Sequence, residues 1–165
     1  MEKIIEGSIG LLMDLIRTQS FSKEEDKTAQ IIDTYLQNHG VKTHRELNNV
    51  WAFNKYFDSS RPTILLNSHH DTVHPNRDYT RDPFLPEIID GKLFGLGSND
   101  AGGCLVSLIG TFLNYYDKQD LKYNFVIAAT AEEEISGLHG LEFVVPKLGE
   151  LEFAIVGEPT QMHLA

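Results

Sequence analysis

The stretch Thr63-Ile64-Leu65-Leu66-Asn67-Ser68-His69-His70-Asp71-Thr72-Val73 joins an apolar run to a polar cluster. The first four residues predict a short buried strand, and the cluster lies where that strand ends. Side chains alternate faces in extended backbone, so His69 and Asp71 should point one way and His70 the other. A metal-binding histidine commonly donates its second N–H to a carboxylate, so this spacing suits a ligand with its orienting group. His-x-Asp alone is a weak motif, and a polar loop after a strand is the simpler interpretation.

Composition places the chain among ordinary globular proteins. It has 165 residues, 41% of them hydrophobic, and a formal net charge of −10 at pH 7. This length fits one domain or part of one. The acidic balance argues against nucleic-acid binding, which needs clustered Lys and Arg. It suits a metal site, but it equally suits a surface that keeps the protein in solution.

The termini and the cysteine content indicate a cytoplasmic protein without a membrane segment. Residues 1–6 carry carboxylates where a signal peptide would need an apolar region, and no run approaches the roughly 18 apolar residues of a membrane span. The one cysteine, Cys104, cannot form an internal disulfide, which suits a reducing compartment. It opens an apolar stretch, so we expect a small core residue rather than a nucleophile.

Apolar periodicity predicts helices alternating with strands. We expect helices over residues 5–16, from a capping box at Ser22-Lys23-Glu24-Glu25 to Gly40, over 105–116 and over 137–145. We expect strands at 41–47 and 50–57, joined by a turn at Asn48-Asn49 with Trp51 and Phe53 on one face, and at 63–66, 92–94, 124–130 and 153–156. A long loop should cover 72–91. The alternation indicates an α/β fold with a mixed, largely parallel sheet and helices on both faces.

Acidic or imidazole side chains follow three of these predicted strands, each of which we expect to be buried. Leu66 leads into His69 and Asp71, Thr130 into Glu132-Glu133-Glu134, and Val156 into Glu158-Pro159-Thr160. Ligands of open α/β sheets bind beyond the carboxyl ends of the strands, so these groups can converge. A His, Asp and Glu cluster without a serine elbow or a reactive cysteine favours a metal-dependent hydrolase.

Each of these motifs has a plainer interpretation. The acidic triplet 132–134 could be a solvated turn, which is usual for a charge run. Asp100, before Ala101-Gly102-Gly103, could cap the next helix, and Glu158-Pro159 could be an ordinary strand exit. The segment Gly95-Leu96-Gly97 lacks the third glycine of a dinucleotide fingerprint and the Lys-Ser/Thr of a P-loop, so nucleotide binding is not expected.

Taken together, four motifs resemble the M20 family of metallopeptidases and deacylases. They are Ser68-His69-His70-Asp71-Thr72-Val73, Gly97-Ser98-Asn99-Asp100-Ala101-Gly102-Gly103, Thr130-Ala131-Glu132-Glu133-Glu134 and Val156-Gly157-Glu158-Pro159-Thr160. Their order and spacing look most like the branch that contains acetylornithine deacetylase and succinyl-diaminopimelate desuccinylase. The resemblance covers nearly the whole chain and implies a catalytic domain like that of the zinc exopeptidases.

The resemblance implies a role for each of six residues. His69 would bind one metal ion, Asp100 would bridge two, Glu134 would bind the other, and Glu158 would complete the His69 side. Asp71 would orient His69, and Glu133 would be the general base for the metal-bridging water. The ions would be zinc, or cobalt. The remaining histidines are expected not to be ligands, with His74 the best placed of them to line a pocket: His39, His44, His74, His139 and His163.

The same resemblance bounds what the chain contains. His70, Ser68, Gly102 and Glu132 depart from common residues of the family, but none of them is an implied ligand. Family members are usually more than twice as long, so residues 1–165 would be the N-terminal portion of the catalytic domain. A lid or dimerisation domain, a final histidine ligand and the substrate-carboxylate contacts would lie elsewhere.

The implied function is hydrolysis of the amide of a small N-acyl amino acid, such as N-acetyl- or N-succinyl-ornithine or citrulline, within amino-acid or arginine biosynthesis. A homodimer through the lid domain is implied as well, whereas the 165-residue chain alone should show little activity. Two alternatives stay open: a dipeptidase or aminoacyl peptidase of the same family, and a non-catalytic metal-binding or partner-binding domain that is complete at 165 residues.

Overall fold

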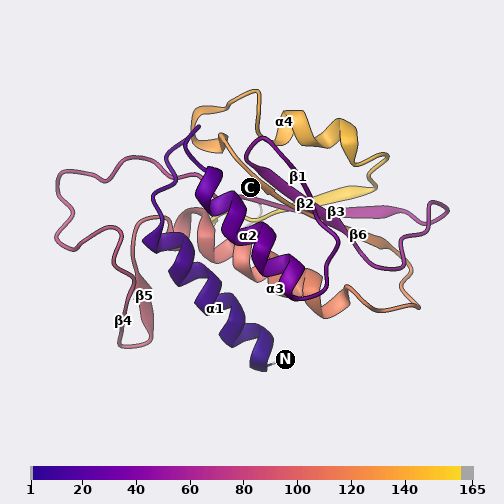
Figure 1. The fold of residues 1–165 in the computed structure, drawn as a ribbon, viewed down its shortest axis with the longest axis horizontal. Helices are drawn as coiled ribbons and strands as arrows, with labels where there is room; N and C mark the ends of the chain where they lie inside the picture. The colour runs from indigo at the N-terminus through magenta and orange to yellow at the C-terminus, as the bar shows by residue number, and fades with distance from the viewer. Residues whose placement is uncertain (1, 161–165) are drawn as a thin grey trace.

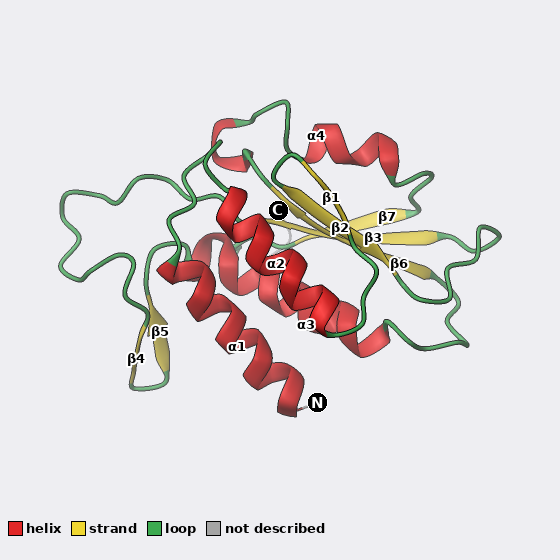
Figure 2. Cartoon of the chain, viewed as in Figure 1, coloured by secondary structure: helices red, strands yellow, loops and turns green. Residues whose placement is uncertain are grey.

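The computed structural model describes residues 2–160, which form a five-stranded mixed sheet between two layers of helix (Figures 1 and 2). The strand order is β1-β2-β6-β3-β7. β3 pairs in parallel with β6 and β7, β2 is antiparallel to both β6 and β1, and four of the five strands therefore run the same way. The bounds of the strands are β1 His44–Glu46, β2 Asn49–Phe53, β3 Thr63–His69, β6 Asn124–Thr130 and β7 Phe153–Val156.

Three helices cover one face of the sheet: α1 (Glu2–Arg17), α2 (Asp26–Asn38) and α3 (Cys104–Tyr115) (Figure 1). Their apolar stripes recur at helical spacing and bury against alternate residues of the strands, which forms the larger core. Its fully buried side chains include Ile32, Leu36, Leu66, Leu105, Ile109, Phe112 and Ile127.

The other face is covered by α4 (Leu141–Val144) and the short turn η3 (Val145–Lys147). Trp51 and Phe53 point to this face, as predicted, and pack with Leu65, Val126 and Val144 in a second, smaller core. Because β3 and β6 are covered on both sides, almost every residue in them is buried.

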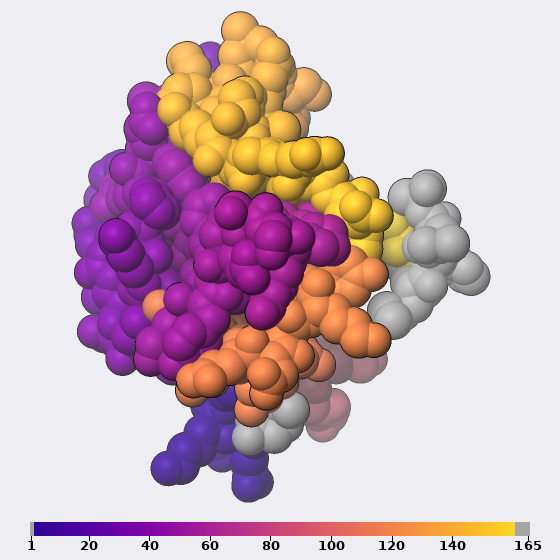
Figure 3. Space-filling view, turned by 90° about the vertical axis from the view of Figure 1, so that its right-hand side faces the viewer, coloured from indigo at the N-terminus to yellow at the C-terminus, as the bar shows by residue number. Residues whose placement is uncertain are grey.

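A long connection follows β3 and projects from the sheet (Figure 2). It carries a two-stranded hairpin of β4 (Glu87–Ile89) and β5 (Lys92–Phe94) and then an irregular turn, η1 (Ser98–Gly103), that leads into α3. The strand predicted at 92–94 is confirmed, and the predicted loop contains β4 as well. At the other end of the strands, where the parallel strands begin, lie the loops coloured magenta and orange in Figure 3.

The predicted capping box at the start of α2 is wrong. The helix begins at Asp26 without any side-chain cap, although Gly40 with φ of +76° does lie just past its end. The Ser22 hydroxyl instead donates to Asp71 at 2.7 Å, and Glu25 is fully buried. Both side chains form tertiary hydrogen bonds instead of capping the helix.

The helix predicted over 137–145 is also wrong in its first half. The His139 carbonyl accepts a hydrogen bond from the Asn49 side chain at 2.7 Å, which fixes this segment as a turn against β2. Gly140 has non-helical φ and ψ of −90° and −130°, so α4 begins only at Leu141. A tertiary bond thus replaces the first turn of the expected helix.

The first two strands are shorter than predicted. Glu46 pairs with Asn49, so the turn is Leu47-Asn48 rather than Asn48-Asn49, and Leu47 takes φ of +53°. Beyond Phe53, the chain leaves the sheet. Within residues 2–160, no helix combines the length and the apolar content needed to cross a membrane.

Candidate metal centre

The end of β3 places His69 and Asp71 on one side and His70 on the other, as strand alternation predicts. His69 Nδ1 lies 3.0 Å from the Asp71 carbonyl oxygen and 3.3 Å from Asp71 Oδ1, and both residues are buried. With its Nδ1–H directed to these oxygens, the imidazole turns Nε2 outward, where it lies 3.2 Å from Asp100 Oδ1. The arrangement leaves one ring nitrogen free for a cation.

His70 serves the fold on the far side of the strand. Its Nε2 lies 2.9 Å from the Asn48 carbonyl and its Nδ1 lies 2.9 Å from the Thr28 hydroxyl. Burial lowers the pKa of His70 to about 4, outweighing the hydrogen bond to Asn48. The ring is therefore neutral, with Nε2–H donating to the carbonyl and Nδ1 accepting from the hydroxyl.

Asp100 comes from η1, the turn between the hairpin and α3. Its φ and ψ of −111° and 103° are not helical, and Gly97 with φ of +72° begins the turn. Gly102 is needed there, because a Cβ would lie 2.6 Å from the Gly97 carbonyl oxygen and 2.7 Å from Leu12. The Asp100 side chain is 57% exposed and faces His69, and it does not cap α3, which rules out the plainer interpretation.

The acidic triplet after β6 is held by its backbone. The N–H of Glu132 donates to Glu25 at 3.2 Å, and those of Glu133 and Glu134 donate to Asp71 Oδ1 and Oδ2 at 3.1 and 3.2 Å. Three successive amides thus bond to two buried carboxylates. The Glu133 and Glu134 side chains are directed to the site, so the triplet is not a freely solvated turn.

Glu158 reaches the site from the end of β7. Its Oε1 lies 3.7 Å from His69 Nε2, close to the 3.6 Å of Glu133 Oε2. The Ser68 hydroxyl donates to the Gly157 carbonyl at 2.8 Å and fixes this exit. Unlike β3 and β6, β7 is exposed along its length, which corrects our expectation of a buried strand.

The charges around His69 are unbalanced. Burial lowers the pKa of His69, but the hydrogen bond and charge of Asp71, with the charges of Glu158 and Glu133, outweigh it and raise the pKa to about 9. Burial raises the pKa of Glu134 and of Glu158, and neighbouring carboxylates add to both shifts. No Lys or Arg within residues 2–160 forms an ion pair with these carboxylates.

The pKa of Asp71 shifts in the opposite direction to those of Glu134 and Glu158. Burial alone would raise its pKa, yet hydrogen bonds from His69, Ser22 and the Glu133 N–H hold the pKa below its ordinary value. Asp71 therefore stays ionised as an anchor, and His69 is the positive group that pairs with Asp100, Glu133 and Glu158 among the described residues.

The ligand atoms have the spacing that a divalent cation needs. His69, Asp100 and Glu134 each offer one atom within 4.8 Å of the others, and so do His69, Glu133 and Glu158. Atoms bound 2.0–2.2 Å from one tetrahedral zinc ion lie about 3.3–3.6 Å apart. His69 Nε2 lies 3.2 Å from Asp100, 3.6 Å from Glu133 and 3.7 Å from Glu158, which is close to that range, and imidazole with carboxylates is a suitable donor set.

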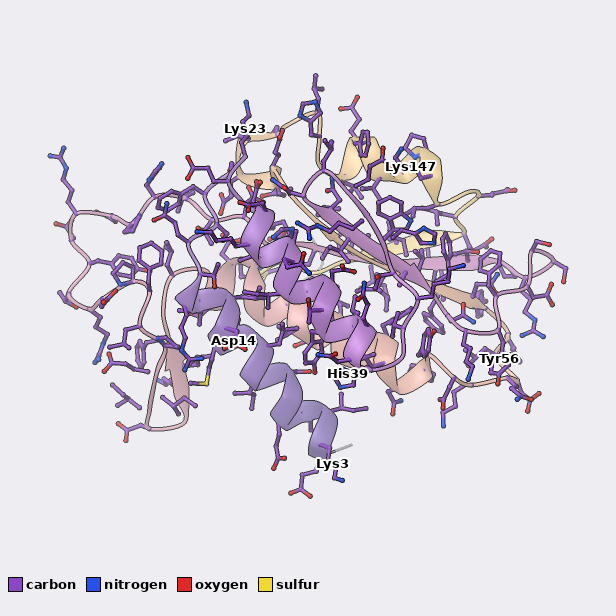
Figure 4. The ribbon with its side chains drawn as sticks, in the orientation of Figure 1. Lys3, Asp14, Lys23, His39, Tyr56 and Lys147 are labelled. Atoms are coloured by element: carbon purple, nitrogen blue, oxygen red, sulfur yellow. The ribbon has the colours of Figure 1, made fainter. Side chains whose placement is uncertain are left out.

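The other polar residues lie apart from this cluster. Figure 4 shows His39 at the end of α2, and His44 stacks on Trp51 with ring centroids 5.5 Å apart. The His74 ring packs against Phe21 at a tilt of 40°, and His139 lies in the turn before α4, 3.3 Å from Glu132. His163 lies outside the described residues.

Cys104 and Ser22 differ from what the sequence indicated. Cys104 is half-buried at the start of α3 rather than in the core, and burial raises its pKa. Ser22 donates to Asp71, and Glu25 accepts from Asn48 and from the Glu132 N–H, although the sequence suggested only a helix cap and a turn. Nothing local signals these roles, because their partners lie 49, 23 and 107 residues away.

Comparison with known proteins shows which family this chain resembles. A family model described as Peptidase family M20/M25/M40 matches residues 65–165. A succinyl-diaminopimelate desuccinylase from Rickettsia felis is 30% identical over 166 residues, which cover 92% of this chain and 44% of the relative. The chain therefore spans less than half the length of that relative.

Solved structures share the fold. An M20 family metallo-carboxypeptidase, Sso-CP2 from Sulfolobus solfataricus, matches with a TM-score of 0.73 and 23% identity over 91% of this chain and 37% of its own. The YXEP protein of Bacillus subtilis, described as a dinuclear metal-binding peptidase of the M20 family, matches with a TM-score of 0.69 and 18% identity, over 94% and 43%. With the family model covering more than half of its residues, this chain belongs to peptidase family M20/M25/M40.

Proposed function

We propose that the protein containing this chain is a metal-dependent amidohydrolase that cleaves the amide bond of a small N-acyl amino acid. One observation carries the proposal: a buried imidazole and four carboxylates, with which no Lys or Arg of the described residues forms an ion pair, converge near the carboxyl ends of β3, β6 and β7. The desuccinylase from Rickettsia felis supports an acylated amino acid as the substrate class.

His69 and Glu158 would hold one divalent cation, Glu134 would hold a second, and Asp100 would contribute to both. Zinc is the expected metal and cobalt the second choice. Such a pair of cations would acidify a water molecule and stabilise the negative charge that develops on the amide oxygen. The dinuclear character of the YXEP protein supports two ions rather than one.

Residues of the chain would transfer the proton and orient the ligands. Glu133 Oε2 accepts the proton of the attacking water and passes it to the leaving nitrogen, which suits a half-exposed carboxylate on a fixed backbone. Asp71 keeps Nδ1 of His69 protonated and Nε2 directed to the cation. Glu133 and Glu134 cannot exchange roles without displacing the metal, because Asp71 fixes both of their amides.

Paired variants of the full-length protein test these roles. Glu133→Gln should lower kcat for N-acyl amino acids by about 10²- to 10⁴-fold while the metal content stays at the wild-type value. Glu134→Gln should instead lower the metal content in elemental analysis. Glu142→Gln on the exposed side of α4 is the matched control. Near-wild-type kcat in Glu133→Gln, or full metal occupancy in Glu134→Gln, would contradict the assignment.

A peptidase of the same family is the second candidate, and the peptidases among the structural matches favour it. Dipeptides and N-acyl amino acids share the amide and differ in the charge of the group on its acyl side. Comparing kcat/KM for glycyl and N-acetyl or N-succinyl derivatives of one amino acid separates the two candidates. A higher value for the glycyl compound would favour the peptidase.

A further inference from the structure

Glu25 is a fully buried carboxylate that pairs with no cation of the described residues. Its oxygens accept three hydrogen bonds, from the Lys23 N–H at 2.7 Å, the Asn48 side-chain amide at 2.7 Å and the Glu132 N–H at 3.2 Å. Burying a charge that only neutral donors satisfy is costly. Glu25 does not offset this cost by capping α2, which has no side-chain cap.

The bond from Glu132 places Glu25 behind the acidic triplet. Glu132 has φ of +56°, a conformation that a residue with a Cβ adopts only when its surroundings impose it. Its N–H is held by Glu25, whereas the next two amides are held by Asp71. Glu25 therefore sets the direction in which the chain enters Glu133 and Glu134.

The bond from Asn48 ties Glu25 to the other half of the site. The Asn48 side chain donates to Glu25 Oε2, and the Asn48 backbone carbonyl accepts from His70, which follows His69 in the chain. Thr28, one turn beyond Glu25 on α2, bonds the other nitrogen of His70. The carboxylate thus connects the end of β3 with the loop after β6.

We propose that Glu25 is a positioning residue of the metal centre, one that acts through the Glu132 amide and Asn48 and touches neither metal nor substrate. The inference rests on the proposed function, because it assumes that Glu134 and His69 bind metal. What matters is the reach of the Glu25 side chain rather than its charge, since all three partners are neutral donors.

Four variants of the full-length, metal-free protein separate reach from charge when titrated with Co²⁺. Glu25→Met fills the space but accepts nothing, and it should weaken Co²⁺ affinity by about 10- to 100-fold. Glu25→Asp keeps the charge but withdraws the carboxylate by about 1.5 Å, and it should also lose affinity. Glu25→Gln keeps the length of the side chain, and the Asn48 amide can turn so that its oxygen accepts from the new NH₂ group. Its Co²⁺ affinity should stay within about 3-fold of the wild-type value. Glu24→Met is the exposed control.

The visible absorption spectrum of the Co²⁺-saturated protein is the second measurement, because it reports ligand geometry that a loss of stability alone does not alter. Spectra should change in Glu25→Met and Glu25→Asp and be unchanged in Glu25→Gln and Glu24→Met. If Glu25→Met does not fold, the comparison of the other two variants tests the inference, and Glu25→Asp should bind Co²⁺ more weakly than Glu25→Gln. Equal Co²⁺ affinity and equal spectra for Glu25→Asp and wild type would overturn the inference. Failure of the wild-type protein to bind Co²⁺ would overturn the proposed function as well.

Discussion

Replacing Asp71 by Asn should destabilise the chain strongly while preserving the shape of the side chain. Asp71 is fully buried, and its oxygens accept from the amides of Glu133 and Glu134 and from the Ser22 hydroxyl. In either orientation, the NH₂ group of Asn would face one of the two backbone N–H groups. One buried donor would then lack an acceptor, which costs about 1–3 kcal/mol.

The surviving bonds would also lose the negative charge of their acceptor. Hydrogen bonds to a charged group are about 1 kcal/mol stronger than neutral ones, and two of them, from Ser22 and Glu134, remain when the NH₂ group takes the place of Oδ1. The free energy of unfolding should therefore fall by about 3–5 kcal/mol. With a urea m-value of about 2 kcal/mol/M, the unfolding midpoint moves down by roughly 1.5–2.5 M.

Urea unfolding of the metal-free protein, followed by tryptophan fluorescence, measures this change. Trp51 is the one tryptophan of the chain and is only 6% exposed, so its emission reports loss of the core. Asp14→Asn is the control, because Asp14 forms an exposed pair with Arg17 on α1 (Figure 4) that is worth about 0–1 kcal/mol. A loss in Asp71→Asn no greater than in Asp14→Asn would refute the reasoning.

Two further predictions concern the histidines of β3. In the metal-free protein, the pKa of His69 is raised from 6.5 to about 9, so its stabilising effect is complete below pH 6.5 and is lost as the pH rises through about 9. Urea titrations in chelator should show this fall, and a His69→Gln variant with the same fall would contradict it. His70→Leu leaves the buried Asn48 carbonyl without its donor, whereas the Thr28 hydroxyl keeps the Glu25 carbonyl as an acceptor at 3.0 Å, so the variant should cost about 1–3 kcal/mol by the same assay. A loss below about 0.5 kcal/mol would count against that bond network.

The parts of the fold that the sequence predicts well are those in which apolar spacing alone decides. The strand at 124–130 is confirmed at both ends, because an unbroken apolar run between polar turns that is too short for a typical helix favours a buried strand. α1 and α3 agree with their periodicity within three residues at each end. The failures at Ser22 and at 137–140 have one cause: long-range bonds to Asp71 and from Asn49 outweigh local helical preference.

The six expected site residues do lie together, because the sequence shows which side chains follow which strands and parallel strands bring their ends to one edge. Their roles are a different matter. Glu133 and Glu158 lie almost equally far from His69 Nε2, so no spacing in the sequence separates a base from a ligand. The support from Glu25 could not be predicted, because its partner Glu132 lies 107 residues away.

The central position of β3 also governs how the chain folds. Both of its neighbours are parallel strands distant in sequence, with Asn67 bonding Ala128, 61 residues on, and pairing with Val156, which is later still. Closing such long loops delays these pairings, so the ligands meet only after most of the native topology has formed. A cation can then add its binding energy only to the finished fold. We therefore expect bound metal to slow unfolding while leaving the rate of folding almost unchanged.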